Sequence, residues 1–186
     1  GGDVFISKDT GPSSSSSDST STSTSSSVVV VSVANFVPLW AGLGSSKHCR
    51  AILQSLEKSD LLGEGGVFTT NIVSGQQWDK PNAWAPLVAL LIEGLDRLSS
   101  DNRDTFQEDG CSEVKALASK LTQQWLQTCF RAWQDTGYMY EKYNATVMGQ
   151  GGDGGEYVPQ TGFGWTNGGA LSLLTRQKGG DQPTYL

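Results

Sequence analysis

The sequence predicts an all-α fold, in which helices form two layers of a ring. One observation is a segment, residues 84–92, that is apolar on every side of a helix. A helix that is hydrophobic all round must be buried nearly all round, as in the inner layer of such a ring. The other observation is a longer segment, residues 112–137, whose apolar residues line one face. A buried helix followed by an amphipathic one is the alternation expected of an α/α toroid.

Helical spacing and capping residues predict the elements in order. Ser45 or Ser46 is a plausible N-cap of the second helix, and Ile52, Leu53 and Leu56 follow at helical spacing. In the amphipathic helix, the residues expected to face solvent are Lys115, Lys120, Gln123, Gln124 and Gln127. The predicted elements are a short helix around Pro38 within 35–43, a helix over 46–61 that stops before Gly63, a loop over 63–75 with a possible short strand at 67–69, a helix from Asn82 or Pro86 to about Ser99, the helix 112–137, a long loop over 138–165 and a last helix from Thr166 or Asn167.

Residues 1–27 are expected to be a disordered segment, and residues 28–186 the folded part. Nearly every residue from Thr10 to Ser27 is Ser or Thr, and Asp18 is the only charge among them. Such a tract has too few apolar side chains for their burial to offset the conformational entropy lost on ordering. An O-glycosylated stalk is the alternative, and it requires a secreted protein.

Charge and hydropathy exclude two classes of partner. The formal net charge is −6 and the 13 basic residues are scattered singly, whereas nucleic-acid-binding surfaces cluster Lys and Arg. Nucleic acid is therefore not an expected partner. The most apolar stretch, residues 28–44, is too short to span a bilayer comfortably, so we expect a buried segment and no membrane span. The compartment and the oligomeric state stay open.

The cysteines and the single histidine indicate no metal site. Cys49, Cys111 and Cys129 show neither C-x-x-C spacing nor a zinc pattern with His. Cys111 and Cys129 fall on one predicted helix, roughly 27 Å apart, so they cannot pair while it is intact. We expect free thiols, with the redox compartment open. His48 is expected to be a solvated or capping residue.

The loop at residues 76–86 (QQWDKPNAWAP) is the first candidate site. It places two tryptophans, amides and a carboxylate just before the buried helix. Flat aromatic faces with planar polar partners suit pyranose rings, which have apolar faces and hydroxyl rims. The alternative is a capped helix with core tryptophans, and composition alone favours it.

The segment YMYEKYN is the second candidate site. Glu141 lies among Tyr138, Tyr140 and Tyr143, whose hydroxyls could orient the carboxylate and whose rings could keep water scarce. That is a reasonable setting for a general base. The alternative is an exposed Glu141 beside Lys142 at a frayed helix end, which the pattern alone favours.

The glycine-rich stretch from residue 149 to 168 is the third candidate. So dense a run of glycine is either a hinge or a place where backbone lies close to a ligand. It lacks the Lys-Ser/Thr that would follow the glycines of a phosphate loop. A mobile lid that swings Glu156 over a pocket fits better.

Four ordered blocks give a specific resemblance. NFVPLWAG, QWDKPNAWAP, MYEKYN and GGDGGEYVPQTGFGWTNG resemble trehalase segments in the same order, the second being similar to QWDxPNGWAP and the last to GGGGEYxxQxGFGWTNG. They span Asn35 to Gly168. The resemblance implies the C-terminal part of an (α/α)6 barrel of glycoside hydrolase family 37. Such enzymes hydrolyse α,α-trehalose to two glucoses with inversion, without a metal or other cofactor.

The resemblance also implies residue roles and a gap. Glu141 corresponds to the general base, Glu156 to a lid residue that contacts sugar hydroxyls, and Trp78 to a candidate pocket wall. The general acid of the family lies in a segment resembling SGWDxSSRW, and this sequence has neither that segment nor the PGGRF signature. We therefore expect a fragment that is inactive alone and needs the missing N-terminal half as partner and trehalose as substrate. The alternatives are a non-catalytic trehalose-binding or regulatory fragment and a helical interaction module without sugar chemistry.

Overall fold

The computed structural model describes residues 29–101 and 109–177, so the expected disordered segment 1–27 lies outside the described residues. The part that is described is mostly helical, as predicted, with one small two-stranded ladder. Its elements are η1 (Val33–Phe36), α1 (Val37–Trp40), η2 (Ser46–His48), α2 (Cys49–Lys58), β1 (Asn82–Trp84), α3 (Ala85–Ser99), α4 (Cys111–Thr136), β2 (Lys142–Asn144) and α5 (Gly164–Gln177).

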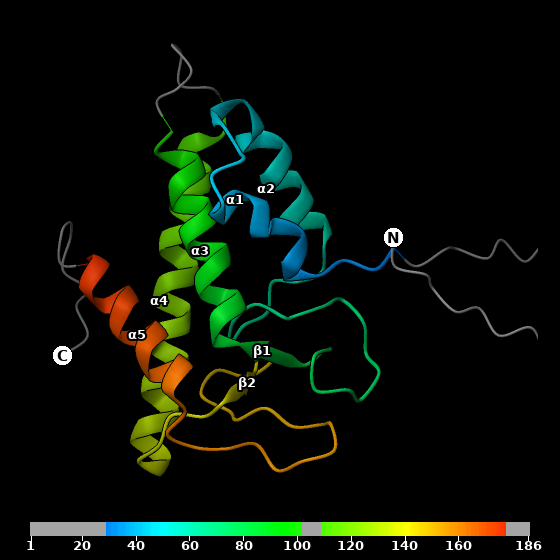
Figure 1. Ribbon diagram of the computed structural model, residues 1–186, viewed down its shortest axis with the longest axis vertical. Coiled ribbons are helices and arrows are strands. Elements are labelled where there is room, and N and C mark those ends of the chain that lie inside the picture. Colours follow the sequence, from blue (N-terminus) through cyan, green and yellow to red (C-terminus); the bar gives the residue numbers. More distant parts are fainter. Residues whose placement is uncertain (1–28, 102–108, 178–186) are drawn as a thin grey trace, which may run out of the picture.

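Helix α3 lies at the centre of the molecule. Figure 1 shows α3 and α4 running side by side, with α1 and α2 on one flank and α5 on the other. No residue from Ala85 to Asp96 is exposed, and half of them are fully buried. The prediction of a helix buried nearly all round is confirmed. None of the helices described is both long and apolar enough to cross a membrane.

Helix α4 is amphipathic, and its bounds differ from the predicted 112–137 by one residue at each end. It ends where Gly137 takes a left-handed conformation, with φ of 78°, as helix C-caps favour glycine. Lys115, Lys120 and Gln123 are exposed as expected, but Gln127 is half-buried, and so is Gln124. Its amide donates a 2.6 Å hydrogen bond to the Gly63 carbonyl, because the loop after α2 lies against α4.

Other predicted boundaries also differ from the structure. The helix predicted over 46–61 begins with the short η2 and ends at Lys58. Residues Asn82–Trp84 form strand β1 rather than the first turn of a helix, and α3 begins at Ala85 with Pro86 in its first turn, where a missing N–H costs nothing. The predicted strand at 67–69 is reduced to an isolated bridge between Leu62 and Val67. The last helix begins at Gly164, two residues before Thr166.

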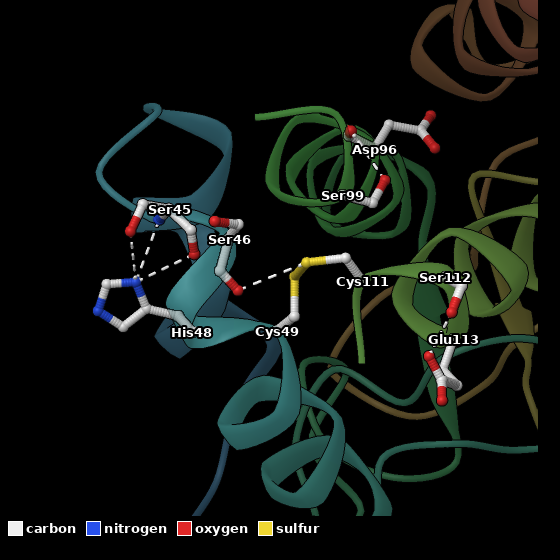
Figure 2. The surroundings of a disulfide bond; sticks show 9 residues. All are labelled: Ser45, Ser46, His48, Cys49, Asp96, Ser99, Cys111, Ser112 and Glu113. Carbon is white, nitrogen blue, oxygen red and sulfur yellow. Dashed lines mark hydrogen bonds between the residues drawn. A yellow bond between two sulfur atoms is a disulfide. The ribbon is translucent and has the colours of Figure 1, made fainter. Parts of the chain in front are cut away.

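A disulfide joins Cys49 to Cys111, so the expectation of free thiols is wrong for these two residues. Figure 2 shows the bond connecting the first turns of α2 and α4. The two Cα atoms are 5.2 Å apart although 62 residues separate them in sequence. Tertiary packing brings the helix ends together, and spacing along the chain cannot reveal that. Cys129 is a free, buried thiol.

The single histidine has the capping role that we expected. His48 is exposed at the end of η2, and its Nδ1 accepts a 3.1 Å hydrogen bond from the Ser45 backbone N–H (Figure 2). This side chain caps a turn and makes no contact with the motif loops, which gather at the opposite end of α3 and α4 (Figure 1).

Candidate active site

The β1–β2 ladder brings the first two candidate loops together. The strands pair antiparallel, with Asn82 opposite Asn144, Ala83 opposite Tyr143 and Trp84 opposite Lys142. The QWDKPNAWAP and MYEKYN motifs, which lie about sixty residues apart in the sequence, thus meet at one end of the α3–α4 pair.

Glu141 is buried, with 6% of its surface exposed. Its Oε1 accepts a 3.0 Å hydrogen bond from the Tyr157 hydroxyl, and its Oε2 accepts a 3.1 Å bond from the Gln160 backbone N–H. The Glu141 backbone is fixed as well, because its carbonyl accepts a 2.9 Å bond from the Trp165 indole N–H. The alternative of an exposed glutamate at a frayed helix end is therefore wrong.

The tyrosine that contacts Glu141 is not one of the three that flank it in sequence. Tyr138 is exposed, and the Tyr143 hydroxyl accepts a hydrogen bond from the Tyr140 backbone N–H. The contacting phenol is Tyr157, whose pKa is raised by desolvation and by its hydrogen bond to Glu141. We did not single out Tyr157, Gln160 or Trp165 from the sequence, although all three lie within the last quoted block.

Lys142 is fully buried beside Glu141. Its ammonium donates a 2.9 Å hydrogen bond to the Gly154 carbonyl and lies 5.6 Å from the ring centroids of both Trp84 and Tyr157. Burial lowers the pKa of Lys142, and the negative charges of Glu141 and Asp153 partly offset that effect. In the sequence, a lysine next to a glutamate indicates a solvent-facing side chain. The burial of Lys142 is therefore shown only by the structure.

The two tryptophans of the first loop differ in burial. Trp84 is a core residue, buried, with its indole N–H donating a 2.8 Å hydrogen bond to the Gln77 carbonyl. Trp78 stacks on it, with centroids 4.0 Å apart and planes 8° from parallel, and remains 44% exposed. Trp84 thus supports Trp78, whose flat apolar face stays exposed at the end of the α3–α4 pair where the QWDKPNAWAP and MYEKYN motifs meet.

Residues 151–157, here called the glycine segment, lie directly on the ladder. The Asn82 side chain binds the Asp153 backbone twice, donating to its carbonyl at 2.8 Å and accepting from its N–H at 3.1 Å. The Gly152 N–H donates to the Lys142 carbonyl at 2.9 Å. A Cβ on Gly152 would lie 2.5 Å from the Asn82 Oδ1, so only glycine allows this approach.

Glu156 takes no part in this network. It is exposed, and among residues 29–101 and 109–177 its carboxylate makes no hydrogen bond or ion pair. The structure therefore brings Tyr157, rather than Glu156, to Glu141. Nor does any group of three or more His, Cys, Asp or Glu side chains in these ranges have the arrangement of a metal site.

An apolar surface lies between α4 and α5, and Glu141 is not among the residues that line it. We call it the α4–α5 face, and its exposed apolar side chains are Phe130, Trp133 and Leu174. A hollow of about 250 Å³ opens there, lined almost entirely by apolar atoms, and Cys129 and Met139 are among its lining residues. Arg176 fastens α5 to α3 through Glu93 and Asp96, at 3.4 and 3.6 Å.

The fold and the site define a segment of an α-helical barrel whose motif loops enclose a buried carboxylate at one end. Residues 19–178 match the profile of the trehalase family, and the chain belongs to that family. It is 42% identical over 153 residues to a probable trehalase of Oryza sativa subsp. japonica and 41% identical over 145 residues to a trehalase of Homo sapiens. Both alignments cover 77% of this chain, but only 25% and 23% of the relatives.

The neutral trehalase Nth1 from Saccharomyces cerevisiae has a similar fold, with a TM-score of 0.54 at 24% sequence identity. The match covers 80% of this chain and 24% of that one. That protein is an (α/α)6 barrel, so this chain has the fold of part of such a barrel. The chain spans about a quarter of the length of the relatives it matches.

Proposed function

We propose that this chain forms the C-terminal part of a barrel that hydrolyses α,α-trehalose to two glucose molecules with inversion. In this proposal Glu141 is the general base. The observation that most supports it is the buried Glu141 carboxylate, oriented by Tyr157 and Gln160 in a chain of the trehalase family.

The proposed chemistry needs two carboxyl groups on opposite sides of the glycosidic bond. Glu141 accepts a proton from water as the water oxygen bonds to the anomeric carbon. A carboxylic acid from the remainder of the barrel gives its proton to the bridging oxygen as the carbon–oxygen bond breaks. Glu141 suits the first role, because each of its oxygens accepts one hydrogen bond from the protein and keeps acceptor capacity for water.

Trp78 and Glu156 are the proposed sugar contacts. The exposed face of Trp78, backed by Trp84, suits stacking against the apolar face of a pyranose. The exposed Glu156 carboxylate directly precedes the tyrosine that contacts Glu141. It is therefore available to accept hydrogen bonds from sugar hydroxyls beside the proposed base.

The remainder of the barrel is the proposed partner, supplying the general acid. The chain spans about a quarter of its relatives, and a ring of helices closes only when each end packs against another helix. The α4–α5 face is the apolar surface available for that packing, with Trp133 51% and Leu174 44% exposed. Exposed apolar patches of this kind mark interaction sites.

Co-expression with an N-terminal barrel part tests the proposal. The partner is the rice relative truncated where this chain begins to match it, and the readout is glucose release from trehalose. We expect turnover with both parts present and none with either alone. Glu141→Gln is expected to lower kcat at least roughly 100-fold, the contribution of a general base.

Glu57→Gln is the matched control, because Glu57 is exposed on α2. It should leave kcat within twofold. Full turnover by the Glu141→Gln assembly would remove Glu141 from the mechanism. Turnover by this chain alone would show that no partner is needed.

A further inference from the structure

Lys142 is a buried cation without a paired anion. Among the described residues no carboxylate lies within ion-pair distance of its ammonium, and its protein hydrogen bond is to the Gly154 carbonyl. Burying an ammonium is costly unless its surroundings compensate. The compensation here comes from a carbonyl and from the faces of Trp84 and Tyr157, which attract cations.

Two of these three partners belong to the glycine segment. Gly154 and Tyr157 are three residues apart, and Lys142 contacts both. The hydroxyl of the same Tyr157 donates to Glu141. The Lys142 side chain therefore connects strand β2 to residues 154–157. Tyr157, at the end of that stretch, contacts the candidate base Glu141.

We propose that Lys142 is a positioning residue, which holds the glycine segment on the ladder and thereby keeps the Tyr157 hydroxyl on Glu141. This inference rests on the proposed function of Glu141 as the general base. Lys142 itself touches neither substrate nor water in this role. Its aliphatic stem lies against Gly152, and the ammonium provides the attachment to Gly154 and to the tyrosine ring.

The first variant is Lys142→Met in the assembled barrel, because methionine keeps the stem and removes the ammonium. We expect amide hydrogen exchange across residues 152–157 to accelerate roughly tenfold, since one hydrogen bond and a cation–π contact are lost. We expect kcat to fall roughly tenfold as well. The control is Lys120→Met, at an exposed position on α4, which should change neither quantity.

The second variant is Tyr157→Phe, which keeps the ring over Lys142 and removes the hydroxyl. Exchange in the glycine segment should stay within twofold of the parent. The value of kcat should fall while KM stays within twofold of the parent, because the general base loses the hydroxyl that orients it and the sugar contacts are unchanged. Lys142→Met should show the same split between kcat and KM.

The double variant decides whether Lys142 acts through Tyr157. If it does, kcat of Lys142→Met/Tyr157→Phe is no lower than that of Tyr157→Phe, since residues in one network are not additive. Additive losses of kcat, or unchanged exchange in Lys142→Met, would overturn the proposal. Where circular dichroism shows that Lys142→Met does not fold, Lys142→Gln replaces it under the same criteria.

Glu141→Gln separates this inference from the proposed function. If that variant turns over normally, the assignment of the base fails. The exchange measurement then still reports whether Lys142 anchors the glycine segment. Loss of turnover in Glu141→Gln together with unchanged exchange in Lys142→Met would leave the proposed function standing and remove the role of Lys142.

Discussion

At the scale of single residues, the glycine segment requires a residue without a side chain at position 152. Gly152 lies between Asn82 and Lys142, and a Cβ there would come within 2.9 Å of the Lys142 Cγ as well as of the Asn82 amide oxygen. Neither neighbour is free to retreat, since the Asn82 side chain is bonded to Asp153 and Lys142 is buried.

Gly152→Ala is therefore expected to destabilise the fold by about 1–3 kcal/mol, the usual cost of overpacking. The measurement is the free energy of unfolding in urea. Gly168→Ala is the matched control, because a Cβ at this position of α5 meets nothing within 4 Å. Alanine in a helix should stabilise by about 0.5–1 kcal/mol. Equal stabilities for the two variants would contradict the packing argument.

The sequence was enough to single out Glu141, Glu156 and Trp78, but not the contacts of Glu141. The roles of all three stay predictions. Tyr157 contacts Glu141 only because the glycine segment folds back onto the β1–β2 ladder, a long-range arrangement that local patterns do not encode. Lys142 was missed for a similar reason, because its burial depends on aromatic rings from two other parts of the chain.

At the scale of elements, the helices were predictable and their connections were not. Periodicity is a local property, so the bounds of α4 came out within one residue and the all-round burial of α3 was foreseen. Strand β1 was missed, because three residues show no period and gain their structure from pairing with β2. The link between α2 and α4 was missed because its two cysteines lie 62 residues apart.

The disulfide is expected to contribute about 4 kcal/mol to stability in the chain-entropy account, since it closes a long loop. The double variant Cys49→Ser/Cys111→Ser should lose roughly that amount in urea unfolding. Adding dithiothreitol should destabilise the parent in the same way and leave the double variant unchanged. Equal sensitivity of both proteins to dithiothreitol would contradict a stabilising bond.

Thiol counting gives an independent check on the same bond. Burial raises the pKa of Cys129 to about 12, so this thiol is protonated and inaccessible in the folded chain. A thiol reagent at pH 8 should label no cysteine in the native chain, one after denaturation and all three after denaturation with reduction. Two or more labels in the native state would contradict the disulfide.

At the scale of the whole molecule, the α4–α5 face is the surface expected to meet the rest of the barrel. Its aromatic side chains are stacked, with the rings of Phe130 and Trp133 6.0 Å apart, and the hollow beside them is apolar. Buried tryptophans often dominate the binding energy of an interface.

Trp133→Glu is expected to weaken association with the N-terminal part at least roughly 30-fold, because it removes an aromatic anchor and buries a charge. The measurement is the Kd of the two parts, by titration calorimetry or analytical ultracentrifugation. Gln134→Glu is the control, since it adds the same charge at the exposed neighbouring position. Equal weakening by both variants would show that charge, and not this face, controls assembly.

The sulfur bridge between α2 and α4 also sets the fate of a chain that has been cut. Cys49 and Cys111 enclose the whole of α3 and the QWDKPNAWAP motif between them. A protease that cleaves the backbone once anywhere between these cysteines leaves two pieces still joined covalently. Such a nicked protein keeps its mass on a non-reducing gel and separates into two bands only after reduction.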